Sequence, residues 1–198
     1  ASGTFGGLTS GSYTVTVTDA NNCTTTVSVT ITQPTALTAS ITTQTNVNCN
    51  GGNTGSVTIL ASGGTPAYQY NIGSGNQASG TFNGLTSGSY TVTVTDANNC
   101  TTTVAITINQ PTALTASITA QTDVNCNGGN TGSVTISASG GTPAYQYNIG
   151  SGNQASGTFN GLTSGSYTVT VTDANNCTTT VAITINQPTA LTASITAQ

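Results

Sequence analysis

The sequence predicts an all-β protein made of tandem immunoglobulin-like β-sandwich domains that repeat every 77 residues. The segment GSYTVTVTDANNC occurs at residues 11–23, 88–100 and 165–177, which sets the period. Apolar and polar side chains alternate along short runs, as they do in strands with one buried face. Glycine- and asparagine-rich turns separate the runs. Solenoid repeats usually take about 20–50 residues, so a longer period suits a small independent domain.

The repeat divides the chain into four parts. Residues 1–34 are expected to be the C-terminal part of a repeat domain, and residues 189–198 the first strand of the next repeat. Two complete domains lie between them, residues 35–111 (the first repeat) and 112–188 (the second repeat). Proline removes a donor from a strand ladder, so Pro111 places a linker at Gln110-Pro111-Thr112. The copies 36–112 and 113–189 differ only at Thr43/Ala120, Asn46/Asp123 and Leu60/Ser137.

Period-two alternation predicts six or seven short antiparallel strands in each repeat and supports no helix. The clearest runs place these residues on one face: Leu37, Ala39 and Ile41; Tyr90, Val92 and Val94; Val104, Ile106 and Ile108; and Leu114, Ala116 and Ile118. Turns are expected at residues 50–53, 63–66, 73–76, 87–88 and 96–99.

Three tyrosines in each repeat are expected to be structural. Tyr68 and Tyr70 share their parity with Ile72, which favours a core role over a sugar-stacking platform. Tyr90 follows Gly88 near a strand start, as in the tyrosine corner of immunoglobulin-like domains.

Composition excludes several classes of function. The only formal charges are Asp19, Asp96, Asp123 and Asp173, and the chain has no Lys, Arg or His. Without a group that titrates near neutral pH we expect no enzyme and no cofactor, and without cations no nucleic-acid partner. No apolar run reaches the roughly 20 residues of a membrane span, so no membrane insertion is expected in this segment.

The five cysteines predict disulfides rather than a metal site, because no His accompanies them and no C-x-x-C pair occurs. Two pairings respect the repeat: Cys49–Cys100 with Cys126–Cys177, or Cys23–Cys49 with Cys100–Cys126. The stabilisation expected from closing the loop is nearly the same for the two pairings. If the alternation of the flanking strands continues to Cys49 and Cys100, both side chains face the core. Their pairing also stays on one side of the linker. We therefore predict Cys49–Cys100 and Cys126–Cys177, with Cys23 bonded to a cysteine upstream of the segment. Such disulfides indicate an oxidising, extracellular setting.

Asp96-Ala97-Asn98-Asn99 and its copies offer Asp19, Asp96 and Asp173 as calcium candidates. One carboxylate is poor provision for a hard divalent ion, so an Asx turn between two strands is the preferred interpretation and no metal site is predicted. Residues that bind a ligand are not identified by the sequence.

The string from Gly63-Gly64-Thr65-Pro66 to Tyr68-Gln69-Tyr70, followed by residues 84–100 and then Gln110-Pro111, resembles the SprB repeat. That family occurs in large cell-surface adhesins of Bacteroidota, including gliding-motility adhesins, and the resemblance covers essentially the whole chain. It implies export by the type IX secretion system, surface anchoring and adhesion.

Together these observations predict a structural and adhesive repeat region of a large extracellular surface protein, forming a disulfide-stabilised stalk or filament for surface attachment. Its expected partners are neighbouring repeats and identical chains in a filament; the surface or polysaccharide target is unknown. The alternative functions are a polysaccharide-binding module and, more remotely, an ice-binding repeat based on the row Thr91, Thr93 and Thr95.

Overall fold

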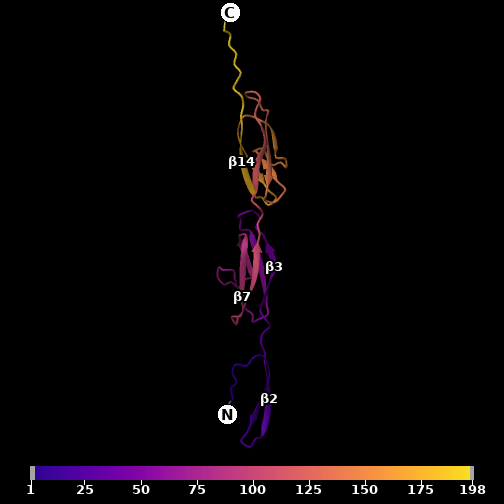
Figure 1. The fold of residues 1–198 in the computed structure, drawn as a ribbon, viewed down its shortest axis with the longest axis vertical. Coiled ribbons are helices and arrows are strands. Elements are labelled where there is room, and N and C mark those ends of the chain that lie inside the picture. Colours follow the sequence, from indigo (N-terminus) through magenta and orange to yellow (C-terminus); the bar gives the residue numbers. More distant parts are fainter. Residues whose placement is uncertain (1–2, 197–198) are drawn as a thin grey trace. The chain divides into compact units, whose positions relative to one another are not determined.

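The computed structural model describes residues 3–196, and within them the chain forms strands, turns and loops with no helix (Figure 1). The predicted all-β class is confirmed. Between residues 3 and 196 no helix is long and apolar enough to cross a membrane. Residues 1, 2, 197 and 198, which belong to the expected segments 1–34 and 189–198, lie outside the described residues.

The second repeat contains six strands in two antiparallel sheets. They are β9 (Thr115–Thr122), β10 (Gly132–Ser139), β11 (Gln146–Asn148), β12 (Thr158–Leu162), β13 (Gly165–Thr172) and β14 (Thr178–Ile185). One sheet has the order β12-β10-β9 and the other the order β11-β13-β14. The first, second and fourth strands therefore share one sheet and the third, fifth and sixth the other. Immunoglobulin-like sandwiches divide strands A, B and E from C, F and G in this way.

The two sheets of the second repeat enclose one core. Val134, Ile136 and Phe159 from one sheet pack in the same buried cluster as Val169 and Val171 from the other. Each such side chain contributes roughly 1.5–3 kcal/mol when it leaves water. The alternation that predicted the strands is thus the alternation between this core and the solvent.

The first repeat has the same six strands. They are β3 (Thr38–Thr45), β4 (Gly55–Ser62), β5 (Gln69–Asn71), β6 (Thr81–Leu85), β7 (Gly88–Thr95) and β8 (Thr101–Ile108), with sheet orders β3-β4-β6 and β5-β7-β8. Tyr70 is buried, which confirms its predicted core role, and Tyr68 is half-buried. The Tyr68 hydroxyl donates to the carbonyl of Gly63 at 2.7 Å, which ties the side chain to its own repeat.

The tyrosine corner predicted at Tyr90 is present. Its hydroxyl donates to the carbonyl oxygen of Thr86, four residues upstream, at 3.0 Å. Tyr167 makes the same bond to Thr163 at 3.0 Å. This bond fixes the turn that leads into the fifth strand of each sandwich.

The remaining strands, β1 (Gly11–Thr18) and β2 (Thr24–Ile31), form a hairpin. Gly11 pairs with Ile31 as Gly165 pairs with Ile185, so the hairpin has the register of β13 and β14. Residues 189–196 form no strand, and a ladder strand needs a partner. The expected first strand at 189–198, like the domain boundaries, stays a prediction.

Contacts between backbone positions divide the chain into two compact units. The first unit holds the described chain up to Ile41 together with Ile59–Gly80 and Thr91–Val104. The second holds Thr42–Thr58, Thr81–Tyr90 and the described chain from Ala105 onward. Parts of the first repeat therefore belong to the same unit as the whole second repeat.

Candidate functional site: a disulfide between consecutive repeats

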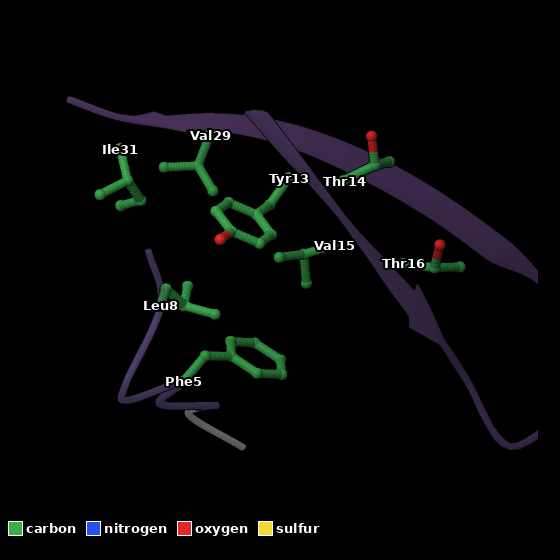
Figure 2. Close-up of a pocket in the computed structure, with 8 residues that line it drawn as sticks. All are labelled: Phe5, Leu8, Tyr13, Thr14, Val15, Thr16, Val29 and Ile31. Carbon is green, nitrogen blue, oxygen red and sulfur yellow. The ribbon is translucent and has the colours of Figure 1, made fainter. Parts of the chain in front are cut away.

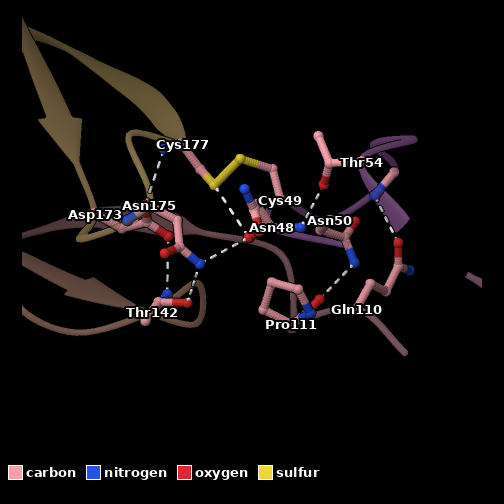
Figure 3. The surroundings of a disulfide bond; sticks show 11 residues. Asn48, Cys49, Asn50, Thr54, Gln110, Pro111, Thr142, Asp173, Asn175 and Cys177 are labelled. Atoms are coloured by element: carbon pink, nitrogen blue, oxygen red, sulfur yellow. Dashed lines mark hydrogen bonds between the residues drawn. A yellow bond between two sulfur atoms is a disulfide. The ribbon is translucent and has the colours of Figure 1, made fainter. Parts of the chain in front are cut away.

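One disulfide joins the two repeats. Cys49 of the first repeat is bonded to Cys177 of the second, 128 residues away, with the two Cα atoms 5.7 Å apart (Figure 3). The predicted pairings Cys49–Cys100 and Cys126–Cys177 are therefore wrong. Cys23, Cys100 and Cys126 are free and exposed. The upstream partner expected for Cys23 stays a prediction.

The second repeat shows why a pairing within one repeat fails. Cys177 directly precedes β14, whereas Val124, two residues before Cys126, donates its N–H at 2.9 Å to the carbonyl of Asn186, just after β14. The two cysteines thus lie at opposite ends of an eight-residue strand. At roughly 3.3 Å per residue that is about 25 Å, whereas a disulfide requires Cα atoms within about 7 Å.

Cys49 lies in a loop of residues 48–52, the Cys49 loop, that is held by its own hydrogen bonds. The N–H of Asn48 donates to Thr54 Oγ1 at 2.8 Å, and the N–H of Gly52 donates to the carbonyl of Cys49 at 2.9 Å. Gly51 has a φ of 74°, a conformation that glycine adopts without strain.

The Cys49 loop also binds the linker. Asn50 Nδ2 donates to the carbonyl of Pro111 at 3.0 Å, and the N–H of Gly51 donates to Gln110 Oε1 at 2.7 Å. The segment predicted as a linker is therefore anchored to the loop that carries the disulfide.

Cys177 ends a turn of residues 173–177, the Asp173 turn, that is organised by one buried carboxylate. Asp173 Oδ1 accepts the N–H groups of Asn175 and Cys177, each at 2.9 Å, and Oδ2 accepts the N–H of Thr142 at 2.8 Å. Asn176 lies between them in the left-handed region, with a φ of 64°. Asparagine tolerates this conformation better than most residues.

The same bonds form around Asp96, whose Oδ1 accepts from Asn98 and Cys100. Around Asp19 they are fewer, with Oδ1 accepting from Asn21 and Cys23. The Asx turn preferred over a calcium loop is therefore the observed structure. Among the described residues no three His, Cys, Asp or Glu side chains are grouped as metal ligands would be.

A hydrogen bond accompanies the disulfide across the junction. Asn175 Nδ2 donates to the carbonyl oxygen of Asn48 at 3.1 Å and also to Thr142 Oγ1 at 3.0 Å (Figure 3). Cys177 Sγ lies 3.5 Å from the same carbonyl oxygen, but a disulfide sulfur has no proton to donate, so this is only a contact. Sequence reasoning missed both Asn48 and Asn175; the available signal was that Asn48 directly precedes Cys49 and that Asn175 lies two residues before Cys177.

The hydrogen bonds lower the pKa of the turn carboxylates. For Asp96 the N–H of Thr65 has the largest effect and lowers the pKa; burial opposes it, and the N–H groups of Cys100 and Asn98 lower the pKa further. For Asp173 burial is the largest influence and raises the pKa, but the N–H groups of Thr142, Cys177 and Asn175 together outweigh it. Both carboxylates are therefore held in the charged form.

We expect the protein to lose stability as the pH falls below about 4. A folded-state pKa below the unfolded one means that unfolding takes up protons. The stabilisation is thus complete above the unfolded pKa and disappears as the pH falls through the folded pKa. Thermal melts by circular dichroism from neutral to acid pH measure this. An Asp96→Asn/Asp173→Asn variant should melt several degrees lower at neutral pH and respond less to acid. A wild-type melting temperature that is constant down to about pH 2 would contradict the assignment.

The hairpin β1–β2 carries an apolar hollow of about 450 Å³ lined by residues that include Phe5, Leu8 and Tyr13 (Figure 2). Phe5 is 64% exposed, whereas its counterpart in the second repeat, Phe159, is 6% exposed because a second sheet covers it. We interpret the hollow as an uncovered core face and not as a ligand pocket.

Comparison with known protein families finds one match in each repeat. The model of the SprB repeat family matches residues 41–77 and 118–154. No curated protein matches the chain.

Three solved structures illustrate the structural similarity. Three N-terminal domains of the bacteriophage RB49 highly immunogenic outer capsid protein are 21% identical, with 76% of this chain and 59% of that chain covered and a TM-score of 0.44. Fibronectin(III)-like modules of Clostridium thermocellum CbhA are 12% identical, with 76% and 95% covered and a TM-score of 0.30. The N-terminal eight Ig domains of Down syndrome cell adhesion molecule are 10% identical, with 90% and 28% covered and a TM-score of 0.42. The sandwich assignment rests on the sheet order of the chain itself.

Proposed function

We propose that the chain, which matches the SprB repeat family in two segments, is a structural and adhesive repeat region of a large extracellular bacterial surface protein, in which disulfide-bridged sandwiches form a stalk for surface attachment. The observation that carries this proposal is the Cys49–Cys177 bond, because it connects two repeats that are already joined by the backbone. A second covalent connection changes how the chain bears load.

The load path follows from the position of the bond. A force applied to the two ends of the chain passes through Cys49, the two sulfurs and Cys177. The backbone between the cysteines, 128 positions long, cannot be drawn out while the bond is intact. The second repeat up to Cys177 and the greater part of the first lie in this protected stretch.

The bond also supports an extracellular location, because such bonds persist where the environment is oxidising. Export through the type IX secretion system and attachment during gliding form part of the proposal; their support is the similarity to the SprB family. The proposed partners are neighbouring repeats and identical chains in a filament, with a target surface of unidentified chemistry.

We expect the isolated chain to show no saturable binding to polysaccharide. Its aromatic side chains are few, and Tyr68 and Tyr70, the strongest candidates for stacking, are engaged in the sandwich. Glycan arrays and pull-down with insoluble cellulose measure this, with the reduced and alkylated chain as the control for folding. Saturable binding would support the polysaccharide-binding alternative, and thermal hysteresis in the same preparation would support the ice-binding one.

A further inference from the structure

Two of the free cysteines lie in local structures that match the two halves of the closed junction. Cys126 has the loop environment of Cys49, and Cys100 has the turn environment of Cys177. Each is therefore one half of a junction whose other half is not supplied within the described chain.

The loop around Cys126, residues 125–129, is already in the bonded conformation. Asn125 N–H donates to Thr131 Oγ1 at 2.9 Å, and the N–H of Gly129 donates to the carbonyl of Cys126 at 2.9 Å. Asn127 Nδ2 donates to the carbonyl of Pro188 at 3.0 Å. The corresponding distances in the Cys49 loop are 2.8, 2.9 and 3.0 Å.

The turn around Cys100, residues 96–100, is equally preformed. Asp96 Oδ2 accepts the N–H of Thr65 at 2.9 Å, and Oδ1 accepts the N–H of Cys100 at 2.8 Å. Asn98 Nδ2 donates to Thr65 Oγ1 at 2.9 Å, as Asn175 does to Thr142 at 3.0 Å. What Asn98 lacks is the second acceptor, a carbonyl placed like that of Asn48.

A hollow lies beside the Cys100 turn, as one does beside Cys177 at the closed junction. Beside Cys100 it has a volume of about 460 Å³, and its lining includes Pro34, Leu37 and Asn98. At the closed junction the hollow beside Cys177 is lined in part by Cys49 and Asn50. The closed junction thus identifies what fits the Cys100 turn, namely an Asn-Cys-Asn loop.

We infer that the Cys100 turn of one copy of this chain binds the Cys126 loop of a second copy and forms a disulfide with it. The interface is heterologous, because each copy uses a turn at one contact and a loop at the other. Such contacts build an open head-to-tail chain and not a closed dimer. The same pairing would connect consecutive repeats along a longer array, which deepens the proposed stalk function and rests on it.

The bond forms by exchange with a small disulfide such as oxidised glutathione. The Cys100 thiolate attacks glutathione disulfide to give a mixed disulfide and release one glutathione thiol. The Cys126 thiolate of the second copy then displaces the other glutathione. Two cysteine thiols are oxidised and one glutathione disulfide is reduced to two thiols. Because both halves are preformed, little conformational entropy is lost on docking.

The test uses the intact 198-residue chain with Cys23→Ser, since Cys23 occupies a partial copy of the same turn. We incubate it in a glutathione redox buffer and separate the products on non-reducing gels. The expected result is a ladder of covalent multimers with Cys100–Cys126 peptides identified by mass spectrometry. Adding Cys100→Ser or Cys126→Ser should abolish the ladder, and an equal mixture of those two proteins should give dimers only.

An Asn98→Ala variant tests the docking geometry, because Asn98 is expected to donate to the Asn125 carbonyl as Asn175 donates to that of Asn48. Loss of one such hydrogen bond should slow multimer formation about fivefold. The matched Asn175→Ala variant should slow closure of Cys49–Cys177 and leave the ladder unchanged.

Three outcomes would overturn the inference: Cys126–Cys126 dimers, a monomer with an internal Cys100–Cys126 bond, or thiols at both positions that stay reduced. If Cys49–Cys177 forms while Cys100 and Cys126 remain reduced, the inference fails and the proposed stalk stands. If Cys49–Cys177 does not form either, both fail.

Discussion

Reducing the Cys49–Cys177 bond should lengthen the fully stretched chain by about 450 Å in single-molecule pulling from the two ends. The bond removes a stretch of 128 residues from the load path, and an extended residue spans at most about 3.3–3.6 Å. With the bond intact, only the chain outside the two cysteines can be drawn out. After reduction both sandwiches unfold under load and release their length.

The control is the Cys49→Ser variant, which should behave like the reduced protein without any reductant, while Cys100→Ser should behave like the oxidised protein. Equal contour lengths before and after reduction would show that the bond does not bear the load, and the mechanical proposal would fail. The test needs no knowledge of the adhesive target.

The resistance to extension increases if the junction recurs along an array, as inferred for Cys100 and Cys126. The bonded cysteines are 128 residues apart, whereas the repeat is 77 residues long. Successive closed loops would therefore overlap, and every stretch of chain between the terminal junctions would lie inside at least one loop. An array of this kind resists extension through its covalent connectivity, whatever the stability of its individual sandwiches.

Local patterns in the sequence were sufficient for the fold. The alternation around Val92 and Ile106 follows from the two faces of a strand, and the tyrosine corner at Tyr90 depends on a bond to a residue only four positions away. The Asx turn at Asp96 likewise depends on near neighbours, because its Oδ1 accepts from Asn98 and Cys100. Strands, the tyrosine corner and the Asx turn each depend on residues close together in the sequence, so the local sequence is sufficient to predict them.

The disulfide could not be found in the same way. Counting in twos extended the strand parity of Cys49 and Cys100 beyond β3 and β8, into loops where the alternation no longer applies. What decides the pairing is the end of the sandwich at which each loop lies, and this depends on how the first and last strands run relative to each other. In the second repeat Gln121 Nε2 of β9 donates to the carbonyl of Thr184 near the end of β14, so both strands finish at the same end of the sandwich. Cys126 therefore lies far from Cys177, a tertiary relation that residue alternation does not contain.

Replacing either bonded cysteine should lower the free energy of unfolding by up to about 5 kcal/mol, the chain-entropy value for a loop of this length. Cys49→Ser, Cys177→Ser and the double variant should be equally affected, because each removes the same single bond. Cys100→Ser and Cys126→Ser, which keep the bond, are the matched controls and should match the wild type at low protein concentration. Urea unfolding followed by circular dichroism, without reductant, measures the differences.

The Asn175→Ala variant separates the covalent from the non-covalent part of the junction. It removes the hydrogen bonds of Asn175 Nδ2 to the Asn48 carbonyl and to Thr142 Oγ1 but leaves the sulfurs in place, so its expected loss is about 2 kcal/mol. The bridged protein should unfold with its two repeats coupled, whereas the cysteine variants should show the repeats unfolding independently. If Asn175→Ala lowered the free energy of unfolding as much as Cys177→Ser, the stability of the junction would depend mainly on the non-covalent contacts of the Asp173 turn. A small effect of Asn175→Ala beside a large effect of Cys177→Ser would assign that stability to the closed loop, the property on which the proposed stalk depends.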